Sequence, residues 1–235
     1  MYDKNWDKYY HHTYKVLKKK ALWDVSPEEA VEKDFETFEV HMDATLPMID
    51  LGCGTGGQAD YLSKKYKTII AVDVSKEAIF VAEAENNNDR IVFDVLDITK
   101  PIENYNFLSA EKEYNIYMRG VLHQIKDEDI AIFQRNILKL LGEKGNMYCV
   151  EVADSIKEVL TKEQGDFSQL PKRMQQVFIS NLPPRGLSLD NIYKYFSEDK
   201  FNIVLSGESF LNTNIKYSDN KSIKIPAIFA LVTKK

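Results

Sequence analysis

Met48-Ile49-Asp50-Leu51-Gly52-Cys53-Gly54-Thr55-Gly56-Gly57 decides the fold of this chain, because an apolar run passes directly into a glycine-rich turn. Glycines at positions 52, 54 and 56 permit positive φ and let the backbone approach a bound molecule more closely than a Cβ would allow. The stretch therefore predicts a buried strand followed by a site for a nucleotide-like cofactor. The spacing alone does not choose the cofactor, since Gly52, Gly54 and Gly57 also satisfy the dinucleotide pattern G-x-G-x-x-G.

Short apolar runs rich in β-branched residues alternate with helical periodicity along the chain. The runs are 46–51, 68–73, 91–96, 115–118 and 147–150, and the runs 201–207 and 225–232 flank a polar, turn-rich stretch at 212–224. Strands that alternate with helices predict an α/β fold built on a doubly wound sheet. Ser75 is positioned to cap the helix after the second run, and Gly142 and Gly145 to end a later helix.

Two segments lie outside this alternation and are expected to cover the sheet. The first is an amphipathic N-terminal helix whose apolar face carries Trp6, Tyr10, Tyr14, Leu17 and Ala21. The second is a helical stretch interrupted by Pro183-Pro184-Arg185-Gly186. We expect a single domain over 1–235, divided into an N-terminal helical lid (1–44), a cofactor-binding core (45–153), a helical cap (154–197) and the last two strands (198–235).

Composition narrows the class of protein. The chain has 235 residues, is 44% hydrophobic and carries a formal net charge of -5, with its lysines scattered except for Lys18-Lys19-Lys20. This charge distribution argues against nucleic acid as a partner. Two cysteines without C-x-x-C spacing predict neither a disulfide framework nor a metal site. The N-terminus shows no signal core and no stretch long enough to span a membrane, so we expect a cytoplasmic protein.

The carboxylate of Asp50 bears on the choice of cofactor. A dinucleotide fold holds a pyrophosphate at the helix N-terminus after the turn, and a carboxylate at the strand end would repel it. S-adenosyl-L-methionine carries an ammonium and a sulfonium group and no phosphate. The position of Asp50 therefore favours S-adenosyl-L-methionine.

The chain resembles the class I S-adenosylmethionine-dependent methyltransferases from about Leu46 to Glu151, and its Asp50-Leu51-Gly52-Cys53-Gly54-Thr55-Gly56 is similar to their first motif. The resemblance implies a seven-stranded, mostly parallel sheet with an antiparallel last strand. It also implies that Asp73, in Ala71-Val72-Asp73-Val74-Ser75, accepts from both ribose hydroxyls. An exposed carboxylate near a helix start is the alternative for Asp73. The implied cofactor-binding residues in these two motifs are Asp50, Gly52, Cys53, Gly54, Gly56, Asp73 and Val74.

Phe93-Asp94-Val95-Leu96-Asp97-Ile98 resembles the third-strand motif of the same family. The resemblance implies that Asp97 accepts from the adenine amino group and that the backbone N–H of Ile98 meets a ring nitrogen. Asp97 is also a candidate cap for the turn before Pro101. Asp94 competes for the adenine role, but strand alternation places it less well at the strand end.

The fourth run continues as Arg119-Gly120-Val121-Leu122-His123-Gln124, similar to the strand-to-helix stretch of the family, which often has a second histidine where Gln124 stands. Arg119 lies at the strand exit, where ligands meet such sheets, and is a candidate for the cofactor carboxylate or the substrate. An ordinary surface arginine is the alternative. His123 is either a candidate for the substrate site or a structural histidine beside apolar neighbours.

The resemblance implies methyl transfer from S-adenosyl-L-methionine to an O, N or other nucleophile of a small molecule, with S-adenosyl-L-homocysteine as product. The candidate substrate residues are Tyr10, Tyr14, His123 and Arg185, and His123 is one candidate general base. Neither the base nor the acceptor follows from the sequence. A methyltransferase acting on protein or RNA, a non-catalytic regulator that binds the cofactor and a nicotinamide-dependent oxidoreductase are the alternatives. The fourth run lacks the Asn/Asp-Pro-Pro-aromatic motif of many macromolecular methyltransferases.

Overall fold

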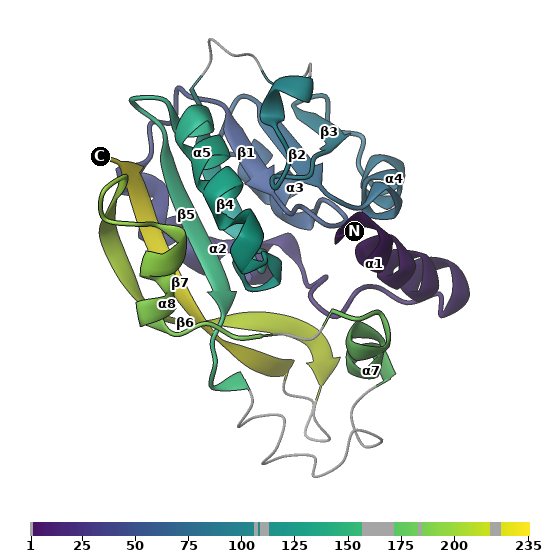
Figure 1. The fold of residues 1–235 in the computed structure, drawn as a ribbon. Helices are drawn as coiled ribbons and strands as arrows, with labels where there is room; N and C mark the ends of the chain where they lie inside the picture. The colour runs from purple at the N-terminus through teal and green to yellow at the C-terminus, as the bar shows by residue number, and fades with distance from the viewer. Residues whose placement is uncertain (1, 106–107, 109–112, 157–171, 183–184, 217–221) are drawn as a thin grey trace.

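The computed structural model describes residues 2–105, 108, 113–156, 172–182, 185–216 and 222–235. Seven strands form one sheet in the order β3-β2-β1-β4-β5-β7-β6 (Figure 1). Strands β1 to β5 run parallel, and β7 runs antiparallel to both β5 and β6. The predicted doubly wound sheet with its antiparallel last strand is confirmed.

The first five strands match the apolar runs of the sequence to within two residues at each end. They are β1 (Met48–Leu51), β2 (Ile69–Asp73), β3 (Ile91–Val95), β4 (Asn115–Arg119) and β5 (Asn146–Val152). Every residue of β1 and β2 is buried, as expected for central strands covered on both faces. The sheet is therefore anchored at its centre by the strand that leads into the glycine turn.

Helices cover both faces of the sheet (Figure 1). Alternate residues of β1, such as Ile49 and Leu51, pack with α5 (Ile130–Leu141) and α8 (Leu189–Tyr195) on one face. Met48 faces the other side, where α2 (Pro27–Phe38) and α3 (Gly57–Ser63) lie. Helix α4 (Lys76–Glu85) follows β2, and the side chain of Ser75 caps it as predicted by accepting from the N–H of Ala78. Short helical turns η2 (Glu39–His41), η3 (Ile102–Asn104), η4 (Leu122–Gln124) and η5 (Asp127–Asp129) complete the connections.

The N-terminal helix is shorter than the apolar pattern predicts. Helix α1 (Tyr2–Tyr10) continues as the wider π-helix η1 (His11–Val16), and Lys18 then takes a positive φ of 52°. Ala21 therefore does not belong to this helix, and the expectation that it shares the helix face is wrong. Ala21 is still fully buried, because the chain turns back and packs beside α1. The three consecutive lysines at 18–20 offer no apolar face to prolong the helix.

The tail also differs from the sequence expectation. Strands β6 (Phe201–Lys216) and β7 (Ser222–Lys234) extend well into the stretch 212–224 that we expected to be a turn. The polar side chains there bond to main-chain groups elsewhere: Asn214 donates to the carbonyls of Ala21 and Asp24 at 2.6 and 2.9 Å. The long hairpin thus holds the connection between η1 and α2 in place. Its polar sequence resembles that of a turn and does not indicate this role.

The expected helical cap is described only in part. Helix α7 (Lys172–Ile179) lies near α1 and shares an apolar cluster with it (Figure 1). Helix α8 instead packs into the core against α5, with Tyr195 and Ile192 in the same cluster as Phe133. Residues 157–171 and Pro183-Pro184 of the predicted cap lie outside the described residues.

Candidate cofactor and substrate site

The glycine turn lies where β1 ends, between the carboxyl ends of its neighbours β2 and β4. Gly52, Gly54 and Gly56 have φ values of 82°, 56° and 85°, as the sequence predicts. The N–H groups of Gly52 and Cys53 both donate to the carbonyl of Val72, at 2.7 and 3.0 Å. The turn is therefore fastened to β2, and its remaining backbone edge faces the sheet opening.

Asp73 closes the end of β2 and faces the same opening. Its Oδ2 accepts from the N–H of Gly54 at 3.0 Å, and its Oδ1 accepts from the N–H of Ser75 at 2.9 Å. Burial raises the pKa of this carboxyl to about 6, although both hydrogen bonds favour the charged form. Each carboxylate oxygen keeps a second lone pair, so the geometry fits an acceptor for two vicinal hydroxyls. Asp73 is buried and is not an exposed helix-start carboxylate.

Asp50 lies beneath the turn on the α2 and α3 face of the sheet. It is 1% exposed, and its Oδ2 has no hydrogen-bond partner among the described residues. Burial and the nearby charge of Asp73 raise its pKa to about 8, while Arg119 acts in the opposite direction. A buried carboxyl oxygen without a partner costs free energy, so this position fits a cationic ligand group close to the turn.

The third-strand motif reaches the same opening through Asp97 and Ile98, which both line the central cavity. Oδ1 of Asp97 accepts from the N–H and the hydroxyl of Thr99, at 3.0 and 2.5 Å, so the carboxyl also caps its own turn. The two sequence interpretations of Asp97 are therefore compatible. Asp94 accepts from the N–H of Val95 and is not among the residues that line the cavity.

Arg119 reaches across from the end of β4 to helix α2. Its guanidinium donates to the carbonyl of Ala30 and lies 4.0 Å from Oδ2 of Asp34, with only 8% of the side chain exposed. Asp34 also accepts from the hydroxyls of Tyr117 at 2.8 Å and Tyr148 at 3.4 Å. Arg119 lines the cavity from this buried network and is not an ordinary surface arginine. No local sequence pattern indicated that Asp34 would support it.

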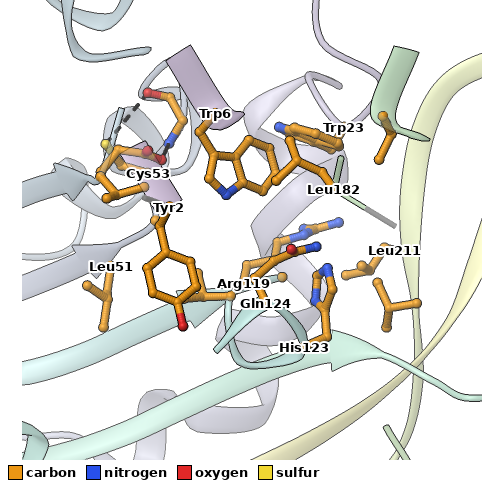
Figure 2. Close-up of a pocket in the computed structure, with 18 of the residues that line it drawn as sticks. Tyr2, Trp6, Trp23, Leu51, Cys53, Arg119, His123, Gln124, Leu182 and Leu211 are labelled. Atoms are coloured by element: carbon orange, nitrogen blue, oxygen red, sulfur yellow. Dashed lines mark hydrogen bonds between the residues drawn. The ribbon is translucent and has the colours of Figure 1, made fainter. Parts of the chain in front are cut away.

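A single cavity runs from the glycine turn to an apolar chamber (Figure 2). Figure 2 shows Trp6 and Trp23 on one side of it and Arg119 and His123 on the opposite side. Tyr10 is 2% exposed and also lines the cavity, and its hydroxyl lies 2.9 Å from where a Cβ on Gly54 would stand. The lining residues beyond the cofactor motifs are mostly apolar: Leu22, Val152, Ile156, Met174, Val177, Phe178, Leu182, Leu211 and Ile225.

Helix α1 is fastened to the sheet edge at two points. Oδ1 of Asp7 accepts from the hydroxyl of Ser75 at 2.7 Å and from the N–H of Glu77 at 3.3 Å, at the N-terminus of α4. The hydroxyl of Tyr2 donates to Asp129 at 2.6 Å, next to the start of α5. Helix α1 thus bridges two elements on opposite sides of the turn.

His123 lies in the turn η4 and borders the chamber. Its Nδ1 is 2.9 Å from Oε2 of Glu151, a fully buried residue of β5. Glu151 also accepts from the N–H groups of Val121 and Leu122, at 2.8 and 2.9 Å. Sequence reasoning missed Glu151; the signal was a single carboxylate inside the apolar run Cys149-Val150-Glu151-Val152.

Four of the predicted site residues do not line the cavity: Asp50, Gly56, Tyr14 and Arg185. Gly56 is the N-cap of helix α3, and a Cβ there would meet the ring of Phe93 at 2.8 Å. The hydroxyl of Tyr14 bonds to Asp24. Arg185 donates to the carbonyls of His123, Gln124 and Ile125, at 3.1 to 3.2 Å, so it supports η4 from behind.

Known proteins share this fold and this motif set. A family model described as a methyltransferase domain matches residues 48–145. The structure superposes with a TM-score of 0.88 on a SAM-dependent methyltransferase from Anabaena variabilis, which is 29% identical, over 98% of this chain and 94% of that one. The matched domain and the fold are those of S-adenosylmethionine-dependent methyltransferases. The family and the cofactor type predicted from the sequence are thereby confirmed.

Two curated relatives of this chain align over part of their length. It is 32% identical to juvenile hormone acid O-methyltransferase of Bombyx mori over 103 residues, which are 42% of this chain and 35% of that protein. It is 21% identical to a probable S-adenosylmethionine-dependent methyltransferase of Saccharomyces cerevisiae over 171 residues, 73% of this chain and 53% of that protein. The matched part of the chain therefore spans about a third of the first relative and about half of the second. None of the described helices has the length and apolarity that a membrane span needs.

Proposed function

We propose that this methyltransferase binds S-adenosylmethionine at the carboxyl edge of its sheet and transfers the methyl group to a small molecule in the adjoining chamber. The observation that carries the proposal is the single cavity, which joins the glycine turn and Asp73 to an apolar space under helices α1 and α7. Cofactor motifs and acceptor space lie in one continuous volume, as a direct transfer between two bound molecules requires.

The residues of the edge fit the cofactor. The unpartnered Oδ2 of buried Asp50 suits the neighbourhood of an ammonium group. Asp73 offers two oxygens for the ribose hydroxyls, and Asp97 and Ile98, which line the same cavity, are the candidates for the adenine. When bound, S-adenosylmethionine supplies a methyl group on a cationic sulfur and leaves as S-adenosylhomocysteine. The protein's contribution is to hold this group and the acceptor in line and to exclude water.

Several features support a small acceptor. The chamber is lined by side chains from α1, η4, α7, β6 and β7, so it is surrounded by elements far apart in the sequence. Asp7 and Tyr2 fasten α1 across the opening at both of its sides. A protein or RNA chain would have to break these contacts to reach the glycine turn, whereas a small apolar molecule fits under the helix.

The test of cofactor binding is calorimetry with two ligands. We expect S-adenosylhomocysteine to bind and NADH not to bind. Binding of NADH alone would instead favour the nicotinamide-dependent alternative and contradict the proposal.

The test of catalysis uses S-adenosylmethionine with an isotopically labelled methyl group. We expect mass spectrometry of a small-molecule extract incubated with the protein to show at least one labelled metabolite, which a parallel incubation with Asp73→Ala should lack. Label that appears only in protein or RNA would contradict the small-molecule acceptor. Cofactor binding with no label in any fraction would favour a non-catalytic regulator.

A further inference from the structure

The pair formed by His123 and Glu151 has a defined proton arrangement. Both oxygens of Glu151 accept hydrogen bonds from N–H groups: Oε1 from Val121 and Leu122, and Oε2 from the backbone of His123 at 3.4 Å. Three N–H groups are thus directed at the two oxygens of Glu151, an environment that suits an acceptor-only carboxylate. With Glu151 as the acceptor, the contact of 2.9 Å between Oε2 and Nδ1 of His123 is made by a proton on Nδ1.

With its proton on Nδ1, the ring of His123 presents Nε2 as a hydrogen-bond acceptor. His123 lines the chamber, and its Cε1 lies 3.9 Å from where a Cβ on Gly120 would stand, above the end of β4. No hydrogen bond is found between Nε2 and any described residue, and Nε2 is not among the fully enclosed polar atoms without a partner. A buried carboxylate that orients a histidine whose other nitrogen faces a ligand space is the arrangement of a general base.

The charges around the chamber disfavour an anionic acceptor. Among the described lining residues, Arg119 is the one arginine or lysine, and its guanidinium is already engaged by the carbonyl of Ala30 and by Asp34. Asp73 and Asp97 line the same cavity, and Glu151 lies directly behind His123. A carboxylate acceptor would enter an apolar space that shares a cavity with two acids and has no free arginine or lysine among the described lining residues.

The rest of the chamber fits an apolar body. Met174, Val177 and Phe178 contribute from α7, Leu211 from β6 and Ile225 from β7. Trp6 and Trp23 meet edge to face with ring centroids 5.5 Å apart and present aromatic surface to the same space. Such a lining favours the binding of a flat or branched hydrocarbon skeleton with one polar group near His123.

We propose that the acceptor is an apolar molecule bearing a neutral, weakly acidic hydroxyl group of the phenol type, and that His123, positioned by Glu151, takes its proton. This inference rests on the proposed function. The acceptor oxygen forms the new O–C bond to the methyl carbon while the S–C bonding pair returns to sulfur, so the sulfonium becomes a neutral thioether. The O–H proton passes to Nε2 of His123, and the O–H bonding pair stays on the oxygen. A carboxylate acceptor would give this base no proton to take.

The first test reads the proton arrangement without activity. In protein labelled with 15N-histidine, His123→Gln assigns the ring signals of His123 among the four histidines. We expect the Nδ1–H form in the wild type. In Glu151→Gln the amide oxygen still accepts from Val121 and Leu122, but the amide NH2 then faces Nδ1, so the proton should move to Nε2. Glu103→Gln, on an exposed carboxylate, is the matched control. The Nε2–H form in the wild type overturns the inference.

The second test needs no variant and compares two probes with one skeleton, 1-naphthol and 1-naphthoic acid. In protein saturated with S-adenosylhomocysteine, we expect 1-naphthol to bind about tenfold or more tightly than 1-naphthoate and to shift the Nε2 signal of His123. Binding of naphthoate with equal or greater affinity, or no binding of naphthol up to its solubility limit, overturns the inference. Failure of S-adenosylhomocysteine to bind contradicts the proposed function instead, so the two failures are distinguishable.

Discussion

The backbone N–H of Gly54 donates to Oδ2 of Asp73 at a distance of 3.0 Å. The glycine turn after β1 and the carboxylate at the end of β2 therefore form one hydrogen-bonded unit. Oδ1 of Asp73 likewise fixes the N–H of Ser75, where helix α4 begins. The carboxylate proposed to hold the ribose thus also shapes the turn proposed to hold the methionine part. A change at Asp73 should affect both the cofactor and the local structure.

Asp73→Ala should lower the affinity for S-adenosylhomocysteine by about 100-fold or more, because two hydrogen bonds to a charged group are lost at about 1.5–3 kcal/mol each. The melting temperature should also fall by a few degrees, since the N–H groups of Gly54 and Ser75 lose their acceptor. Calorimetry and thermal unfolding measure the two effects. Asp94→Ala removes a carboxylate of the neighbouring strand outside the cavity and should leave affinity unchanged. Unchanged affinity in Asp73→Ala would remove Asp73 from the site.

Gly54→Ala should disturb the contact between the turn and the N-terminal helix. Gly54 has a φ of 56°, and a Cβ there would lie 2.9 Å from the hydroxyl of Tyr10. We expect weaker cofactor binding and a faster proteolytic cleavage within the N-terminal helix. Gly57→Ala is the matched control, because a Cβ at Gly57 meets nothing within 4 Å and the residue begins helix α3. Equal proteolysis rates for the two variants would contradict the role of the Tyr10 contact.

Asp7→Ala should free one side of helix α1 from the sheet edge. Asp7 accepts from the Ser75 hydroxyl and the Glu77 N–H, and its loss leaves the Tyr2 contacts to Asp129 and Lys126 at the other side. We expect S-adenosylhomocysteine to dissociate roughly tenfold faster, which corresponds to about 1.4 kcal/mol. Stopped-flow dissociation measures this rate, with Lys4→Ala on the exposed side of the same helix as control. A dissociation rate that Asp7→Ala leaves unchanged would mean that α1 does not gate the cofactor.

The sequence predicted the central strands well because their residues are buried on both faces and read as continuous apolar runs. It also located Asp73, since a carboxylate at the end of such a strand can face only the carboxyl edge. Residues whose partners are distant in sequence were harder to place. Glu151 meets His123 across 28 positions, and Asp34 meets Tyr117 across 83. Neither pairing leaves a local pattern, because tertiary packing alone brings these side chains together.

Arg185 also has partners that could not be predicted from its sequence neighbours. It was predicted as a candidate substrate residue, but its guanidinium donates to the carbonyls of His123, Gln124 and Ile125. The carbonyl groups of a tight turn need hydrogen-bond donors, and the sequence does not show which side chain will supply them. Arg185 thus supports the backbone around His123, whereas the sequence analysis treated the two residues as independent candidates.

The buried carboxyl of Asp50 should make the stability of the cofactor-free protein depend on pH. Its pKa is raised to about 8 by burial and by Asp73, against 3.8 for the unperturbed group. Between these values the folded protein holds a proton that the unfolded chain has released, so the free energy of unfolding falls as pH rises through this window. Asp73, with a pKa raised to about 6, acts in the same direction over a narrower range. The contribution of these two carboxyl groups therefore makes the protein more stable near pH 5 than near pH 8.

Asp50→Asn tests this directly, because the amide keeps the shape of the side chain and does not ionise. The difference in melting temperature between about pH 5 and about pH 8 should shrink by roughly 5 °C or more relative to the wild type. Thermal unfolding of the cofactor-free protein measures it, and Asp94→Asn, whose carboxyl is outside the cavity, should keep the wild-type difference. S-adenosylhomocysteine should reduce the wild-type difference as well, since its ammonium group favours the charged carboxylate. An equal pH dependence in wild type and Asp50→Asn would show that Asp50 stays ionised in the folded protein, in which case Arg119 outweighs its burial.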